Sequence, residues 1–286
     1  MKVLIIFFSQ TGSTEKIAKE IQNGIIKSGN DCDLEKIKKV NIESLADYDL
    51  IGIGTPTFFY REPVNVKLFI SRLDNLTGKH CFIFATHGSI IGNTFYYMDE
   101  QLRKKGLQVI ANYDSYGNSA MKIYPQPMHT AGHPDEIEIR EAETFGETIC
   151  EISKKVQSGD TTMIPKFTFI SNTWWNKQSE QLSPEFLRKV SPKFVINEDV
   201  CTKCLACEEN CPVDAVDIEA NPPEIQKEGC ISCYYCEQVC PVGAIETDWT
   251  RFAKISRGNL PRYIEALEIA EKQGKFRPYV DYRNIK

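Results

Sequence analysis

Residues 201–212 read CTKCLACEENCP, and residues 230–241 read CISCYYCEQVCP. Both runs have the spacing Cys-x2-Cys-x2-Cys-x3-Cys-Pro, so one cysteine pattern occurs twice within a short stretch. Four cysteine thiolates are the usual ligand set of an iron–sulfur cluster, and the two runs provide eight. A domain this short buries little apolar surface, so we expect metal ligation to supply much of its stability.

Structural zinc is the alternative for these cysteines. Zinc ribbons use paired Cys-x2-Cys units, with four tetrahedral ligands for each ion. Each run here instead has three closely spaced Cys and a fourth directly before Pro. The doubled spacing therefore favours iron–sulfur clusters over zinc.

Residues 193–247 resemble the bacterial two-cluster ferredoxins, including the paired sequences CPVDAV after the first run and CPVGAI after the second. In those proteins the fourth Cys of each run ligates the other cluster. The resemblance therefore implies a small α+β domain over residues 193–248 with two [4Fe–4S] clusters. The ligands expected for one cluster are Cys201, Cys204, Cys207 and Cys240, and those expected for the other are Cys230, Cys233, Cys236 and Cys211.

The N-terminal stretch joins a strand to a helix through hydroxyl-rich residues. Residues 3–8 form a short apolar run typical of a buried strand, and Ile17, Ala18, Ile21 and Ile25 mark one helical face. The joining residues are Ser9, Gln10, Thr11, Gly12, Ser13 and Thr14. Backbone N–H groups and hydroxyls at a helix N-terminus bind phosphate well. The alternative is an ordinary helix cap, since Ser and Thr favour that position.

The following elements alternate between strand and helix. Strands are predicted over residues 34–37, 50–54, 81–86 and 107–113, and helices over 64–73, 93–104 and 136–156. This alternation predicts an α/β fold with a doubly wound, five-stranded parallel sheet. Ligands of such folds bind at the carboxyl ends of the strands.

Two of these strand ends carry unusual residues. The third strand runs into Thr55, Pro56, Thr57, Phe58, Phe59 and Tyr60, and the fourth ends in Thr86, His87, Gly88 and Ser89. Adjacent aromatics suit a planar apolar ligand, although at least one could simply pack onto the next helix. Gly88 permits close backbone approach to a ligand, and Ser89 can donate a hydrogen bond.

Residues 1–157 resemble the flavodoxins, on the basis of the Ser-x-Thr-Gly-x-Thr loop and the positions of the two later loops. The resemblance implies that residues 9–14 bind the phosphate of FMN and that residues 55–60 and 86–89 bind its ring. Many flavodoxins have a Gly just after the third-strand loop, whereas this chain has Tyr60-Arg61-Glu62. The second ring loop lacks the usual aromatic cover, and His87 there is either a proton donor or a surface side chain that forms hydrogen bonds.

The domain organisation predicted from the sequence has four parts. Residues 1–158 form the FMN domain, 159–192 a linker, 193–248 the iron–sulfur domain, and 249–286 an extension that packs on both domains. The linker contains Trp174-Trp175, which either anchors it to a domain or covers the flavin. A loop over residues 116–133 contains His129 and His133, a spacing that also allows metal binding. The extension is predicted to contain a helix over residues 261–273.

The formal charge is unevenly distributed along the chain. The whole chain carries −5, whereas residues 193–247 carry −8 and residues 248–286 carry +4. An acidic module suits docking to basic redox partners and argues against nucleic-acid binding. Cys32, Cys81 and Cys150 are expected to be packed in the core, which together with the clusters indicates a reducing cytoplasm. We expect no membrane span, since no apolar run is long enough.

Two function classes are compatible with the sequence. The whole chain resembles the flavodoxin–ferredoxin fusions of anaerobes, which implies an electron-transfer protein between a low-potential donor and a separate acceptor. The alternative is an FMN-dependent oxidoreductase that reduces a small substrate at an open flavin face. The chain has no nucleophile–base pair and no dinucleotide fingerprint, which favours the electron carrier.

Overall fold

The computed structural model describes residues 1–286 except 120, 182–185, 187–188, 221–222, 227 and 286. The chain divides into two compact units. The sheet unit comprises residues 1–117 and 132–180, and the cysteine unit comprises residues 118–131 and 181–286. Within the described residues, no helix is both long and apolar enough to span a membrane.

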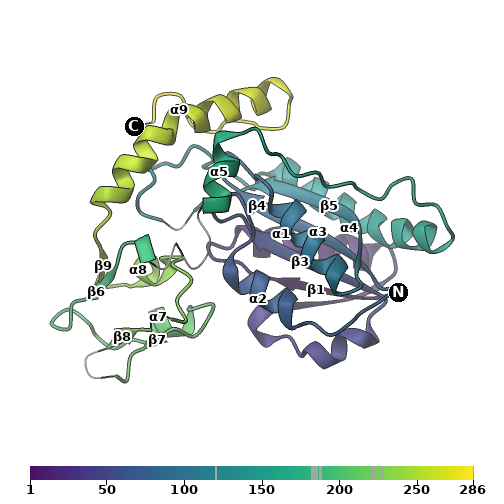
Figure 1. Cartoon of the computed structure of the whole chain (residues 1–286), viewed down its shortest axis with the longest axis horizontal. Coiled ribbons are helices and arrows are strands. Elements are labelled where there is room, and N and C mark those ends of the chain that lie inside the picture. Colours follow the sequence, from purple (N-terminus) through teal and green to yellow (C-terminus); the bar gives the residue numbers. More distant parts are fainter. Residues whose placement is uncertain (120, 182–185, 187–188, 221–222, 227, 286) are drawn as a thin grey trace. The chain divides into compact units, whose positions relative to one another are not determined.

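The sheet unit contains one parallel sheet with the strand order β2-β1-β3-β4-β5 (Figure 1). The strands are β1 (Lys2–Phe7), β2 (Asp31–Lys36), β3 (Leu50–Pro56), β4 (His80–His87) and β5 (Gln108–Tyr116). The helices between and after them are α1 (Ser13–Lys27), α2 (Val64–Arg72), α3 (Thr94–Lys104) and α4 (Glu136–Gln157), with short 3-10 turns at Ile37–Lys39 and Ile42–Asp47. The predicted doubly wound parallel fold is therefore confirmed.

Both faces of this sheet are covered, which explains the continuous apolar runs of its central strands. Helices α1 and α4 pack together against one face, and α2 and α3 pack together elsewhere on the sheet. The α1–α4 contact is close because Gly24 and Gly146 face the partner helix, where a Cβ atom on either would meet backbone atoms. Cys81 and Cys150 are buried, as core packing requires.

The cysteine unit is built from short elements. Strands β6 (Phe194–Ile196) and β9 (Ile245–Thr247) form one antiparallel pair, and β7 (Val216–Asp217) and β8 (Glu224–Ile225) form another. The helices of this unit whose bounds lie within the described residues include α7 (Ala206–Glu209), α8 (Tyr235–Val239) and α9 (Thr250–Lys272). Residues 118–131 belong to this unit, where Lys122 Nζ lies 3.9 Å from a carboxylate oxygen of Glu237.

The helix predicted over residues 261–273 is wrong at its start, because α9 begins at Thr250 and contains Pro261. Proline inside a helix removes one backbone hydrogen bond, here to the carbonyl of Arg257. Both residues are exposed, so water can bond that carbonyl. The chain after α9 folds back onto it, with the Tyr282 hydroxyl donating to Glu271 at 2.6 Å.

Candidate cofactor sites

The three loops predicted to bind FMN follow β1, β3 and β4, which are neighbours in the sheet. The Phe8 N–H donates to the Gly54 carbonyl at 3.0 Å, and the Thr57 N–H donates to the Thr86 carbonyl at 2.8 Å. These bonds extend the strand pairing into the loops. All the residues predicted to bind FMN therefore lie along the carboxyl edge of the sheet, although their contact with FMN stays a prediction.

The loop over residues 9–14 has the features of an anion site at the start of α1. Gly12 is the N-cap with a φ of 89°, so the N-cap residue has no side chain with which to cap this helix. The buried Ser9 Oγ has no hydrogen-bond partner. A helix N-terminus leaves several N–H groups without intrahelical partners, and its dipole favours an anion. An orphaned hydroxyl beside such N–H groups fits a bound phosphate.

A second feature joins this loop to the loop after β4. The Thr14 and Thr86 hydroxyls are buried and lie 2.7 Å apart, so one donates to the other. The Gly117 N–H donates to the His87 carbonyl at 2.8 Å, and a Cβ on Gly117 would lie 2.9 Å from Ser13 Cβ. Sequence reasoning missed Gly117, for which the available signal was a glycine just after the fifth strand.

The loop after β3 is a tight turn with left-handed backbone. Phe58 and Arg61 exchange two backbone hydrogen bonds of 2.9 and 3.2 Å, and the central residues Phe59 and Tyr60 have φ values of 51° and 68°. Such turns favour glycine or asparagine, since bulky residues with positive φ are strained. Strain of this kind is often found where a backbone meets a ligand. The chain thus forms the turn without the glycine of many flavodoxins.

The aromatic residues of this turn have different surroundings. Phe58 packs edge-on against Phe8, with ring centroids 6.1 Å apart, so its ring contact is with a residue just after β1 and not with the next helix that the sequence suggested. Tyr60 is buried and contacts both tryptophans of the predicted linker. Phe59 is half-buried.

His87 is a buried residue with two polar neighbours. Its Nδ1 lies 2.7 Å from the Gly88 carbonyl oxygen, and its Nε2 lies 3.3 Å from Asp114 Oδ2. Both of these neighbours are acceptors, so each ring nitrogen of His87 faces an oxygen atom. The interpretation of His87 as a surface side chain is therefore wrong, because its side chain is only 4% exposed.

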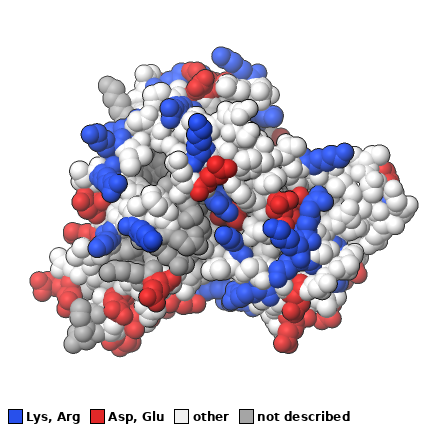
Figure 2. Space-filling model, viewed as in Figure 1, with Lys and Arg blue, Asp and Glu red and all other residues white. Residues whose placement is uncertain are grey.

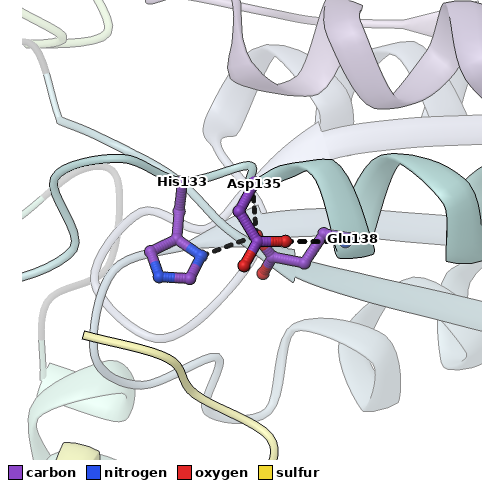
Figure 3. A group of neighbouring side chains, drawn as sticks. All are labelled: His133, Asp135 and Glu138. Atoms are coloured by element: carbon purple, nitrogen blue, oxygen red, sulfur yellow. Dashed lines mark hydrogen bonds and ion pairs between the residues drawn. The ribbon is translucent and has the colours of Figure 1, made fainter. Parts of the chain in front are cut away.

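A cluster of His133, Asp135 and Glu138 at the start of α4 is a helix cap (Figure 3). Asp135 Oδ1 accepts from the N–H groups of Ile137 and Glu138, while Glu138 Oε2 accepts from the Asp135 N–H and lies 2.6 Å from His133 Nδ1. The carboxylates are thus satisfied by protein donors, as in a capping box. His129 belongs to the cysteine unit, and burial lowers the pKa of its imidazole.

In the cysteine unit the backbone repeats along with the sequence. The residues on either side of the second Cys of each run have positive φ, namely Lys203 and Leu205 in the first run and Ser232 and Tyr234 in the second. The fourth Cys of each run accepts a backbone N–H at 3.2 Å, from Ala215 to Cys211 Sγ and from Ala244 to Cys240 Sγ. Each run thus wraps its sulfur atoms with the same local structure.

The folding of the two runs brings Cys residues together across the repeat. One small cavity is lined by Cys201, Cys204, Cys207 and Cys240, together with apolar residues that include Ile196 and Ile218. Burial raises the pKa of the Cys236 thiol, and the nearby thiols of Cys233, Cys230 and Cys211 raise it further. The structure therefore places the fourth Cys of each run beside the first three Cys of the other run.

The spacing of these sulfur atoms suits a cluster better than a single ion. Four thiolates on one zinc ion at about 2.3 Å lie only about 3.8 Å from one another. Among the described residues, the one group of three or more candidate ligand atoms that all lie within 4.8 Å of one another is His133, Asp135 and Glu138, and it contains no Cys. No three of the described cysteine sulfur atoms are therefore as close together as the ligands of one zinc ion.

The acidity of the thiols bears on metal ligation in general and does not distinguish iron from zinc. Burial raises the pKa of Cys207, and it raises the pKa of Cys233 to about 12. Burial also acts on Cys240, but backbone N–H groups including that of Ala244 outweigh it, so the pKa of this thiol lies below its ordinary value. Buried thiols become thiolates when a cationic partner compensates their charge, as iron does.

Comparisons with known proteins identify a domain in each half of the chain. The Flavodoxin domain family matches residues 4–118, and the 4Fe-4S dicluster domain family matches residues 193–241. A flavodoxin of Clostridium saccharobutylicum is 30% identical over 169 residues, which cover 54% of this chain and 99% of that protein. A flavodoxin of Clostridium beijerinckii is 27% identical over 151 residues, which cover 52% of this chain and 99% of that protein.

Among solved structures, a flavodoxin from the domain Archaea aligns with 54% of this chain and 99% of its own, with 22% identity and a TM-score of 0.44. The relation to the flavodoxins rests on the family match and the sequence identities. The chain therefore belongs to the flavodoxin family through its N-terminal domain, and with its 4Fe-4S dicluster domain it is a flavodoxin–ferredoxin fusion, an electron-transfer protein of the flavin and iron–sulfur type.

Proposed function

We propose that this chain relays low-potential single electrons between two [4Fe–4S] clusters and one FMN, and exchanges them with a separate redox protein. The observation that carries the proposal is the crossed grouping of eight cysteines in the cysteine unit of a chain whose other unit has a flavodoxin sheet. When bound, each cluster carries one electron and FMN carries one or two, so single electrons can accumulate or be divided.

The residues of the sheet unit hold FMN by its two ends. The N–H groups at the start of α1 and the hydroxyls of Ser9, Thr11 and Thr14 bind the phosphate. The turn at Phe58–Arg61 and residues 86–89 bind the ring. Several donors converge on one dianion, and hydrogen bonds to a charged group are among the strongest in proteins.

In the cysteine unit, eight thiolates hold the clusters, and backbone N–H groups adjust their electronic properties. Cys211 and Cys240 each accept an N–H at 3.2 Å, and Cys230 accepts one from Ser232 at 3.4 Å. Hydrogen bonds to the sulfurs stabilise negative charge and so shift the reduction potential of a cluster.

The surface charge of the cysteine unit suits a basic partner. Figure 2 shows acidic side chains gathered over the part of this unit around β7 and β8, and basic side chains along α9. The exposed acidic residues near the first cysteine run are Glu198, Asp199 and Glu209. Complementary charge accelerates encounter with a partner and weakens with added salt.

The test is a stopped-flow measurement of flavin reduction after a one-electron donor reduces the clusters. Transfer within one chain predicts a first-order rate that does not change when the protein is diluted tenfold. A rate that falls in proportion to protein concentration would show transfer between molecules, and the two units would then be independent carriers.

A further inference from the structure

The linker predicted between the domains contains a segment, residues 164–181, that packs onto the sheet unit. We call it the strap, and it includes α5 (Trp174–Gln181). Phe167 packs on Phe95 with ring centroids 5.9 Å apart, and Phe169 packs on Tyr96 at 5.2 Å. Both partners lie on α3, so alternate strap residues anchor the strap to this helix.

Buried amides tie the strap to both ring loops. Asn93 Nδ2 donates to Asn176 Oδ1 at 2.7 Å, and Asn93 Oδ1 accepts the Ile170 N–H at 3.1 Å. The Asn93 N–H in turn donates to the Tyr60 carbonyl at 2.9 Å. Asn93 and Asn176 are each only 2% exposed. One buried asparagine at the end of the second ring loop therefore joins the strap to the turn after β3.

The two tryptophans of the strap contact that turn directly. The Tyr60 ring lies 5.6 Å from Trp174 at an interplanar angle of 79°, and 6.1 Å from Trp175 at 36°. Gly92 lies against Tyr60, since a Cβ on Gly92 would lie 2.5 Å from Tyr60 Cβ. Both tryptophans are only half-buried, so each indole keeps exposed surface beside the ring loops.

The second ring loop offers no comparable surface. Residues 86–93 contain no Phe, Tyr or Trp, and the His87 ring is buried between Gly88, Asp114 and Tyr116. A conjugated planar ring gains much of its binding energy by stacking on aromatic side chains. Tyr116 and Phe8 also contact these loops, but both are buried, whereas the two tryptophans of the strap combine contact with Tyr60 and partly exposed rings.

We propose that the strap is the third segment of the FMN ring site and that Trp174 and Trp175 supply the aromatic cover that residues 86–93 lack. The inference rests on the proposed FMN site and extends it. The strap is then a part of the flavin site, and it directly precedes the cysteine unit in the sequence. Anchoring alone does not require the indoles, since Phe167, Phe169 and Asn176 already attach the strap to α3 and Asn93.

The experiment measures FMN binding to the flavin-free full-length chain by titration, together with the fluorescence of the bound flavin. The test variants are Trp174→Ala, Trp175→Ala and the double variant, and each tryptophan is also replaced by Phe. Two controls match them. Phe167→Leu alters the strap on α3 without touching an indole, and Trp249→Phe removes the third tryptophan, which lies in the cysteine unit.

We expect the double Ala variant to bind FMN at least about tenfold more weakly and to restore emission of the bound flavin, which stacked indoles quench. The Phe variants should keep most of the affinity, and both controls should match the wild type. Unchanged affinity and quenching in the double variant would overturn the inference. So would an equal loss in Phe167→Leu, because the strap would then act only as a support. A wild-type chain that binds no FMN would instead contradict the proposed function itself.

Discussion

The sheet unit and the cysteine unit hold themselves together by different means. The sheet unit buries most of its central strands completely, and residues such as Ile5, Phe82 and Ile149 have no exposed surface. Among the described residues of the cysteine unit, one core cluster contains six buried side chains, two of which are Cys207 and Cys211. The core cluster of the sheet unit contains none of the residues predicted to bind FMN, whereas that of the cysteine unit includes candidate iron ligands. Loss of the cofactors should therefore affect the two units unequally.

Removal of iron should produce the largest effect and confine it to one unit. After anaerobic chelation, the cysteine unit should lose its protection against hydrogen exchange, because cluster binding supplies much of its folding free energy. The sheet unit should keep its protection and its affinity for FMN. Hydrogen exchange read by mass spectrometry, peptide by peptide, makes the comparison. Equal protection of residues 193–247 with and without iron would show that the small core suffices.

Replacing a single cysteine ligand should damage one cluster of the cysteine unit at a time. Cys211→Ala should leave the same cluster spectrum as Cys233→Ala, and Cys240→Ala the same as Cys204→Ala, because each fourth Cys lies with the other run. Electron paramagnetic resonance of the reduced variants provides the readout. If Cys211→Ala instead matched Cys204→Ala, the crossed ligand assignment would be wrong.

Changes in the loop over residues 9–14 should affect FMN binding in the sheet unit and leave the cysteine unit unchanged. Replacing both Thr11 and Thr14 by Val removes two hydroxyls from the proposed dianion site, each worth roughly 1.5–3 kcal/mol, so FMN affinity should fall at least about tenfold. The iron content should not change, since the loop lies in the sheet unit. Thr148→Val, on the exposed side of α4, is the matched control and should bind FMN as the wild type does. If the double variant retained wild-type affinity, the loop would be only a helix cap.

The smallest expected effect concerns the strained turn after β3. Phe59→Gly relieves a left-handed conformation that costs a non-glycine residue about 1–2 kcal/mol, but glycine has a larger entropy loss on folding. The net stabilisation of the sheet unit should be at most about 1 kcal/mol, or a rise in Tm of roughly 2–4 °C. Calorimetry of the full chain measures it, and a lower Tm would mean that the Phe59 side chain contributes more packing than its half-buried position suggests.

The sequence predicted those features that depend on local patterns. The apolar runs of β1, β3 and β4 are unbroken because both faces of their sheet are covered, so their positions could be read directly. The doubled cysteine spacing likewise repeats in the backbone, down to the positive φ values on either side of Cys204 and Cys233. Pro261 was misleading, since it suggested a helix start at a point that lies inside α9.

The features that sequence reasoning did not find depend on contacts between distant residues. Asn93 and Asn176 are 83 residues apart, and neither has a neighbour in sequence that indicates their pairing. The same holds for Gly117, which matters only because β5 ends beside Ser13. The pairing of Cys240 with the first cysteine run came from resemblance to a family, because spacing alone allows other groupings.

Cofactor analysis of anaerobically purified protein tests directly whether the chain binds two [4Fe–4S] clusters and one FMN. Two four-iron clusters and one flavin site predict about eight iron atoms, about eight acid-labile sulfides and one FMN per chain. Zinc in place of iron, or about four iron atoms in protein that retains all eight cysteines, would contradict the account.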